Sequence, residues 1–396
     1  WWNGEGAAMT MAEGDLAVAE IRFVQGQYLP PQPAPMRMTG AIGWVRANLL
    51  STPANIVLTV LVLALVVWIV YGIVDFLIVD AVWTGADRTA CLASTVHREV
   101  GACWPFVWDR LSYFIYGSYP IPERWRVDVF FALLAVGVAW MLWLQAPRRD
   151  LGALYFFVVL PIVSFILLHG FAAIGLPLVD TVLWGGVLVT IVLATVGIVV
   201  SLPIGIVLAL GRRSRMPAVQ FFSTVFIEFV RGVPLITVLF MASVMLPLFV
   251  PEGFEPDKLL RAMVGIALFA SAYMAEVVRA GLQAIPRGQF EGAMAVGLGY
   301  RPMMRLIILP QALRITIPNI VNTYIGLFKD TSLVTIIGIF DLLNTIEVSR
   351  SDPKWATPVT STTGYAVAAM FYLAFCYGMS RYARATEARL GKSDKR

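Results

Sequence analysis

Two groups of ionisable residues lie inside long apolar stretches, where a charge is costly and is therefore a candidate for function. Glu276 and Arg279 are three residues apart, a spacing that lets two side chains pair on one helix. The second group is a run of four polar residues: Lys329, Asp330, Thr331 and Ser332. Such groups can contact a charged solute or can brace neighbouring helices. We predict the bracing role for each group and keep solute contact as the alternative.

Other kinds of chemistry find little support in the sequence. The only histidines are His97 and His169, and neither has a partner at the spacing of metal ligands, so we expect no metal site. No G-x-S-x-G stretch marks a hydrolase nucleophile. Gly391-Lys392-Ser393 resembles the end of a phosphate loop, but Thr386 replaces its first glycine. We therefore predict no catalytic residue, no bound cofactor and no ATP hydrolysis by this chain alone.

The composition indicates the class of protein. Of the 396 residues, 59% are hydrophobic and 14% are charged, whereas soluble domains carry about 25% charged residues. The formal charge of +5 is too small and too dispersed for a nucleic-acid-binding surface. We predict an all-α integral membrane protein whose apolar surface faces the lipid bilayer.

The spans follow from the length of the apolar stretches, because a helix needs about 20 such residues to cross a bilayer. Eight stretches qualify: 56–79, 127–144, 153–174, 183–210, 234–250, 261–278, 312–339 and 362–382. The polar segments between them alternate in charge. Basic segments lie at 147–150, 211–215, 279–305 and beyond 381. With eight spans these share one side with both termini, which the positive-inside rule assigns to the cytoplasm.

The remaining segments complete this topology. Residues 1–55 form a predicted cytoplasmic tail, and 386–396 form a second, basic one. The chain opens without the pattern of a signal peptide, so we expect no cleavage. The loop 80–126 is placed outside, where an oxidising compartment favours a disulfide between Cys91 and Cys103. The alternative is that these are free thiols too far apart to join.

One cytoplasmic loop, 286–310, has a distinctive spacing. From Glu291 onward it reads EGAMAVGLGYRPMMRLIILP. This resembles the EAA loop of importer-type ABC permeases, E-A-A-x3-G-x9-I-x-L-P. The positions that match or align with the pattern are Glu291, Gly292, Ala293, Gly297, Ile307, Leu309 and Pro310. Gly292 is the one departure, and it lowers helix propensity by about 1 kcal/mol relative to alanine.

The residues of this loop predict a short helix over 289–296. Glu291 would lie in its first turn, where the helix dipole favours an acid. Gly297 or Gly299 would end the helix in a left-handed conformation, and Pro302 would open the next one. In the resembled family this coupling helix docks onto the ATPase subunit. The alternative is an ordinary amphipathic connector.

Flanking segments resemble the polar amino-acid permease family, the histidine, glutamine and arginine importers. Residues 231–235 read RGVPL, similar to the F-R-G-T-P-L segment of that family. Further similar segments are 275–279, 285–289, 309–314 and 329–333. The resemblance covers about 183–390 and implies a type I importer domain, 175–385, with a core of five helices. The three accessory spans in 56–174 resemble those of the general L-amino-acid permease subunits.

The resemblance also implies partners. A second homologous permease, two ABC ATPases that bind ATP and Mg²⁺, and a periplasmic amino-acid-binding protein would complete an importer in the bacterial inner membrane. An amino-acid zwitterion needs donors for its carboxylate and acceptors for its ammonium group, which the two polar groups contain. The alternative is an ATP-independent secondary transporter or channel for small polar solutes, whose mark would be inverted repeats with broken helices. A membrane-embedded enzyme would need a cluster of His, Asp or Glu that the sequence lacks.

Overall fold

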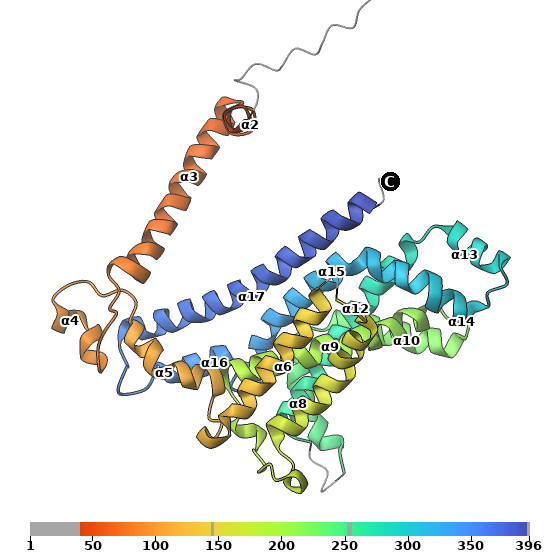
Figure 1. Cartoon of the computed structure of the whole chain (residues 1–396). Coiled ribbons are helices and arrows are strands. Elements are labelled where there is room, and N and C mark those ends of the chain that lie inside the picture. The colour runs from red at the N-terminus through yellow and green to blue at the C-terminus, as the bar shows by residue number, and fades with distance from the viewer. Residues whose placement is uncertain (1–39, 144–145, 252–255, 394–396) are drawn as a thin grey trace, which may run out of the picture. The chain divides into compact units, whose positions relative to one another are not determined.

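Helices account for the regular structure of the computed structural model, which describes residues 40–143, 146–251 and 256–393 (Figure 1). Within these ranges the β-type pairing is limited to isolated bridges. The chain divides into two units, 1–73 and 74–396. Most of the predicted N-terminal tail, residues 1–39, and the last residues of the C-terminal tail, 394–396, lie outside the described residues.

The described part of the first unit consists mainly of helix α2, Gly40–Asn48, and most of helix α3, Pro53–Val74. Helix α3 is apolar on all sides and none of its residues is buried. A helix that is hydrophobic all round suits a lipid environment. The apolar span that begins in α3 runs from Pro53 to Val79, long enough to cross a bilayer.

In the second unit, two accessory helices pack against each other. Helix α6 is Arg124–Leu142, and α8 is Leu160–His169, preceded by α7, Arg149–Leu154, and the π-helical turn η4, Tyr155–Val159. Arg126 at the start of α6 is fully buried. Its guanidinium pairs with Glu123 at 2.7 Å and donates to the carbonyl oxygen of Pro177 at 2.9 Å. The buried charge therefore fastens α6 to the segment that leads into the helical core.

Four long helices form that core: α9, Gly186–Arg212; α12, Lys258–Ala284; α15, Leu309–Asp330; and α17, Pro358–Ser393. Helix α12 packs against both α9 and α15, and α17 packs against α15. Small residues permit the close approach, as is typical of membrane helices. A Cβ at Gly205 would meet Met274 at 2.8 Å, and one at Gly281 would meet the Ala312 carbonyl oxygen at 2.7 Å.

One predicted span is a broken element. Helix α10, Pro217–Gly232, is followed by α11, Leu235–Phe240, and the turns η7, Met241–Met245, and η8, Leu246–Phe249. The two halves meet at 105°. Pro234 explains the break, because proline lacks the amide donor and keeps the preceding residue, Val233, out of the helical conformation. The predicted span 234–250 is therefore only the second half of a bent pair.

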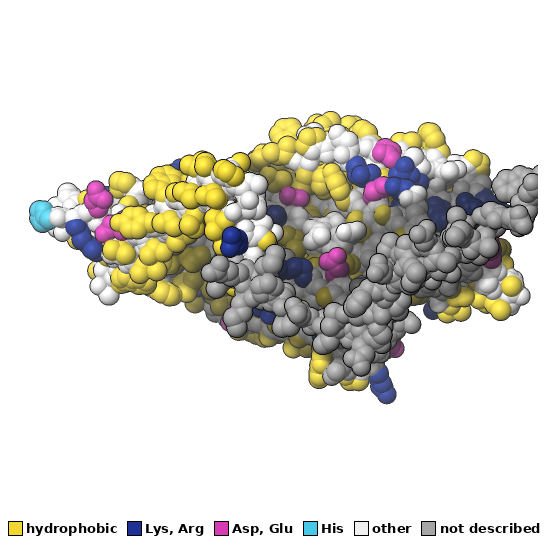
Figure 2. All heavy atoms as spheres, turned by 90° about the horizontal axis from the view of Figure 1, so that it is seen from above, with side chains coloured by type: hydrophobic (Ala, Val, Ile, Leu, Met, Phe, Trp, Pro, Cys, Tyr) yellow, Lys and Arg dark blue, Asp and Glu magenta, His cyan; other side chains and the backbone are white. Residues whose placement is uncertain are grey.

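The span count agrees with an all-α membrane fold. Among the described residues seven helices are long and apolar enough to cross a membrane, and eight if the bent pair counts as one span. Hydrophobic side chains cover much of the face drawn in Figure 2, while charged side chains lie in small groups. The prediction of about eight membrane helices is thus confirmed.

The remaining short elements are η1 Asp75–Val79, η2 Arg88–Cys91, α4 Ala93–Val96, α5 Trp104–Tyr116, η3 Ile121–Glu123, η5 Ala172–Ile174, η6 Thr181–Leu183, α13 Arg287–Ala295, α14 Tyr300–Met303, η9 Met304–Ile308, η10 Thr331–Ile337 and α16 Leu342–Ser349.

Candidate functional site

The predicted coupling helix is α13, and a left-handed glycine ends it. Gly297 has φ of +76°, whereas Gly299 has an ordinary φ of −68°. The amide of Leu298 donates to the carbonyl of Ala293 at 3.1 Å, and the amide of Gly297 donates to that of Met294 at 2.9 Å. This pair of hydrogen bonds is a Schellman motif, which satisfies the last carbonyl groups of the helix. Gly297 is therefore the residue that turns the chain out of α13.

The start of this helix differs from the prediction. Helix α13 begins at Arg287, directly after the extended residue Pro286, and not at Gln289. Glu291 consequently lies in the second turn, so the prediction that it lies in the first turn was wrong. The physical reason is the proline: its fixed φ suits a residue that leads into a helix, so the helix starts at once after it. Glu291 is instead exposed on the surface of α13.

Helix α13 is held to the membrane domain by one side. Ala293 is 3% exposed and belongs to a core cluster that includes Met303, Met304 and Ile308. The motif residues Ile307 and Leu309 pack against the same cluster, whereas Pro310 is exposed at the start of α15. The side-chain amide nitrogen (Nε2) of Gln311 donates to the side-chain oxygen (Oε1) of Gln289 at 3.2 Å. The motif thus supplies the side chains that anchor the loop.

Other residues of the loop are exposed. Met294 is 58% exposed and Val296 is 74% exposed, and Glu291 and Gly292 are exposed beside them. Arg301 and Arg305 add exposed positive charge further along. Exposed apolar side chains within a polar surround are typical of a surface that binds another protein. This arrangement has the character expected of a docking surface.

The Glu276–Arg279 pair is part of a larger ionic network. The Nε of Arg279 donates to Glu276 Oε2 at 2.9 Å. Arg212 of α9 and Arg231 of α10 approach the same carboxylate at 3.5 and 3.6 Å. Arg212 also pairs with Glu228 of α10 at 2.7 Å. Because Glu276 already has three basic partners on three helices, the geometry favours the bracing role.

The second polar group lies elsewhere on the core. Lys329 and Asp330 end α15, and Thr331 and Ser332 begin the 3₁₀ turn η10. The Thr331 hydroxyl donates to the Phe328 carbonyl at 2.8 Å, and the Ser332 hydroxyl donates to the Lys329 carbonyl at 2.9 Å. The two hydroxyl groups therefore donate within their own turn. Lys329 is exposed and Asp330 half-buried, and no ion pair joins them in the described structure.

The two polar groups are not brought together by the fold. Helix α15 starts beside the coupling loop and ends at the second group, so its ends are ~30 Å apart at about 1.5 Å per residue. The ionic network lies towards the coupling-loop end, because Arg212 ends α9 and Glu276 lies in the second half of α12. The sequence also gave no indication of Arg212 or Glu228 as partners, since both come from other helices. Within the described ranges no group of three potential metal ligands occurs.

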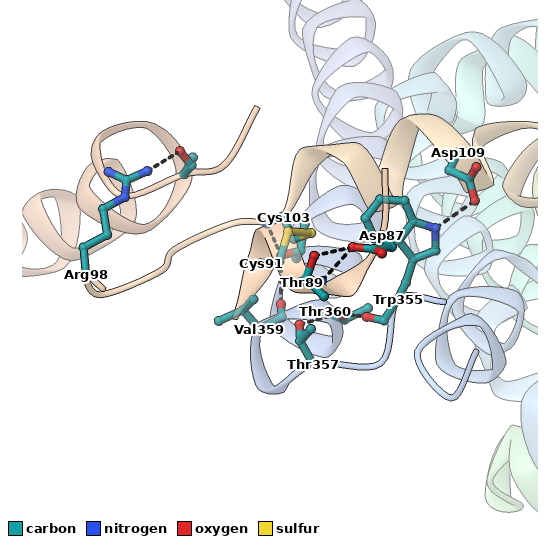
Figure 3. The surroundings of a disulfide bond; sticks show 12 residues. Asp87, Thr89, Cys91, Arg98, Cys103, Asp109, Trp355, Thr357, Val359 and Thr360 are labelled. Atoms are coloured by element: carbon teal, nitrogen blue, oxygen red, sulfur yellow. Dashed lines mark hydrogen bonds between the residues drawn. A yellow bond between two sulfur atoms is a disulfide. The ribbon is translucent and has the colours of Figure 1, made fainter. Parts of the chain in front are cut away.

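The long loop after the first span is closed by a disulfide. Cys91 ends η2 and Cys103 precedes α5, and their sulfur atoms are 2.00 Å apart (Figure 3). Both residues are buried, at 2% and 0% exposed. The amide of Cys103 donates to the Thr363 hydroxyl of α17 at 3.0 Å. The structure therefore places the pair as the predicted disulfide, fastened to the last core helix.

The same loop also binds the segment between α16 and α17. The indole of Trp355, which is 1% exposed, donates to an Asp109 oxygen at 2.8 Å. Lys354 pairs with the other Asp109 oxygen at 2.7 Å, and the Arg88 amide donates to the Lys354 carbonyl at 2.8 Å. The Lys354 ammonium holds the pKa of the Asp109 carboxyl below its usual 3.8. Figure 3 shows Asp109 and Trp355 meeting close to the disulfide.

Thiol labelling should report the disulfide directly. The chain has three cysteines, and the structure leaves Cys376 free. We expect the denatured, unreduced chain to take up one maleimide, at Cys376, and the denatured, reduced chain to take up three. Peptide mapping of the labelled sites checks the assignment. Labelling of Cys91 or Cys103 without reductant in denatured protein would show that the bond is not formed.

The Asp109 contact should weaken in acid. Because the folded pKa is below the unfolded one, its stabilisation is present above about 3.8 and is lost as pH falls through the folded value. Hydrogen exchange in residues 352–357, corrected for intrinsic rates, should therefore speed up at low pH. Asp109→Asn should show the fast exchange already at pH near 7. Glu99→Gln, an exposed acid of the same loop, is the matched control and should behave as the wild type.

Known proteins are similar to this chain over most of its length. Residues 201–392 match the family model described as "Binding-protein-dependent transport system inner membrane component". The inner membrane amino-acid ABC transporter permease protein YhdY of Escherichia coli K12 is 47% identical over 360 residues, covering 91% of this chain and 96% of that protein. The chain belongs to the amino-acid ABC transporter permease family. It is therefore a multi-pass membrane subunit of an ABC transporter.

Two further comparisons show how far the similarity extends. The glutamate/glutamine/aspartate/asparagine transport system permease protein BztC of Rhodobacter capsulatus is 39% identical, over 96% of this chain and all of that protein. The similarity thus includes the accessory spans. A solved structure described as an amino acid ABC transporter with histidines is 27% identical and covers 52% of this chain and 92% of its own, with a TM-score of 0.46.

Proposed function

We propose that this permease subunit forms the translocation path of an ATP-driven amino-acid importer in a bacterial inner membrane. The observation that carries the proposal is the coupling helix. Helix α13 lies in the segment that has the spacing of the EAA loop; it is anchored by the buried Ala293 and leaves Met294 and Val296 exposed. The names of YhdY and BztC support amino acids as the class of substrate.

The partners follow from this arrangement. Two ATPase subunits bind ATP and Mg²⁺ and receive the exposed face of α13. A second, homologous permease completes the path, and a periplasmic amino-acid-binding protein delivers the substrate. The basic residues Arg287, Arg301 and Arg305 of the coupling loop support a cytoplasmic position for it. With eight spans, both termini then lie on the same side in this proposal.

The ionic network supports a mechanical role in this cycle. Arg212, Arg231 and Glu276 link α9, α10 and α12 near the end of the spans that carries the coupling loop. We propose that this network keeps the three helices together when α13 moves with the ATPases. Contact with the amino acid is the alternative for Glu276 and Arg279, and for Lys329, Asp330, Thr331 and Ser332.

Reconstitution tests the function. The chain is expressed with the ATPase, second-permease and binding-protein partners and placed in proteoliposomes, and uptake of labelled amino acids is measured with and without ATP on the ATPase side. We expect uptake that needs ATP, the binding protein and this chain together. A partner ATPase that cannot hydrolyse ATP is the control. Uptake that an ion gradient drives in the absence of ATP would contradict the proposal and favour a secondary transporter.

A further inference from the structure

An apolar cavity lies between the accessory helices and the permease core. Its volume is about 590 Å³, within the range of ligand-binding pockets, which is ~300–1,000 Å³. The cavity is lined by side chains from α6, α8, α9 and α12, among them Phe130, Leu168, Val196, Val199 and Met263. The accessory helices therefore do not pack flush against the core at this place. No feature of the proposed transport cycle uses this space.

The cavity opens towards lipid. Four of its lining residues are large and exposed: Phe165 is 61% exposed on α8, and Leu260, Val264 and Leu268 are 46%, 46% and 38% exposed on α12. In a membrane protein such side chains face acyl chains, so the opening is sideways into the bilayer. Water is a poor occupant, because an apolar cavity offers it too few hydrogen-bond partners.

Polar atoms without partners are found in the wall at one end. Ser164 is 8% and Trp184 5% exposed, and both line the cavity. The Ser164 hydroxyl, the Trp184 indole N–H and the His169 Nδ1 are buried and have no hydrogen-bond partner among the described residues. The carboxylate of Asp257 lies in the same wall but already accepts from the amides of Leu259 and Leu260.

These polar atoms lie at the depth of the membrane interface. His169 ends α8, and Trp184 lies two residues before the start of α9, so both lie where spans meet the membrane interface. This face of the molecule is also the one that carries the disulfide, because the backbone of Gly117, just after α5, bridges that of Trp184. Ester carbonyl groups of phospholipids lie at the interface, and tryptophan is enriched there because its N–H can donate to such acceptors.

We propose that the cavity binds one acyl chain of a membrane phospholipid. The chain fills the apolar part, and the Trp184 indole and the Ser164 hydroxyl donate to the ester carbonyl oxygens of the same lipid. A free amino acid does not fit this site, because its two charges would be buried against apolar walls without partners. The bound lipid completes the packing between α8 and the core helices α9 and α12.

Photo-crosslinking tests the site on the whole chain in nanodiscs. The probe is a phosphatidylcholine that carries a diazirine in one acyl chain, and the labelled peptides are mapped by mass spectrometry. We expect labels on cavity residues of α8, α9 and α12. Val196→Phe, which fills the cavity, should lower these labels roughly ten-fold, while labels on lipid-facing surfaces stay constant. Val207→Phe is the matched control, because Val207 is 68% exposed on the same helix and does not line the cavity.

A second variant keeps the test informative if Val196→Phe misfolds. Ser164→Ala combined with Trp184→Phe removes both donors and leaves the apolar lining, so it should also reduce cavity labelling in protein that elutes as the wild type does. The proposal is overturned if both folded variants label like the wild type, or if cavity residues label no more than the surroundings of Val207. Displacement of the label by a free amino acid would also overturn it and would point to a solute site instead.

Discussion

Gly297→Val is expected to abolish ATP-driven uptake while the chain still reaches the membrane. Gly297 has φ of +76°, a conformation that costs a residue with a Cβ about 1–2 kcal/mol and a β-branched one more. Loss of this turn removes the hydrogen bonds from Gly297 and Leu298 that end α13. The exposed residues Met294 and Val296 then leave the positions in which they would meet the ATPase. The measurement is uptake in proteoliposomes together with co-purification of the ATPase.

Two control substitutions distinguish the effect of losing the left-handed turn from the effect of adding a side chain to the surface. A Cβ at Gly297 or at Gly299 would meet no atom within 4 Å, so neither substitution is limited by space. Gly299→Val adds the same side chain at an ordinary φ of −68° and should keep most of the uptake. Gly297→Asn should retain more activity than valine, because asparagine tolerates the left-handed region. If Gly297→Val keeps both uptake and the ATPase, the loop is a connector and the coupling proposal fails.

The membrane spans could be predicted because their signal is local. An apolar run of about 20 residues is sufficient evidence for a span, and each predicted stretch has a helix in the structure. The first half of the broken span, Pro217–Gly232, was missed because it carries Glu228 and Arg231. Those charges lower its hydropathy, and only the fold shows that they pair with residues of α9 and α12. A local pattern cannot show a partner that comes from another helix.

Some features of the candidate site could likewise be predicted from local sequence, and others could not. The spacing from Glu291 to Pro310 is a local signal, and it indicated the coupling loop and its glycine turn. The spacing of Cys91 and Cys103 was compatible with a bond and with free thiols, so the pairing needed the structure. The sequence gave no indication of the cavity beside Trp184, because the empty volume arises from the way in which four separate helices pack against one another.

The loop 80–126 is joined to the core through a close backbone approach. Gly186, the first residue of α9, has φ of +65°. Its amide donates to the Phe340 carbonyl at 2.9 Å and to the Thr345 hydroxyl at 3.1 Å. A Cβ at this position would lie 2.1 Å from the carbonyl oxygen of Phe114, the residue near the end of α5. Only glycine lets α5, α9 and the start of α16 meet at this point.

Gly186→Ala should therefore destabilise the whole second unit. The left-handed conformation costs about 1–2 kcal/mol, and the clash with the rigid backbone of Phe114 adds about 1–3 kcal/mol. Gly175→Ala is the matched control, because Gly175 also has a positive φ, +77°, but a Cβ there meets nothing within 4 Å. Thermal unfolding in detergent should show a clearly larger loss of Tm for Gly186→Ala, with faster hydrogen exchange in α5. Equal losses for the two variants would mean that backbone conformation alone matters, and that the contact with Phe114 does not hold the loop 80–126 to the core.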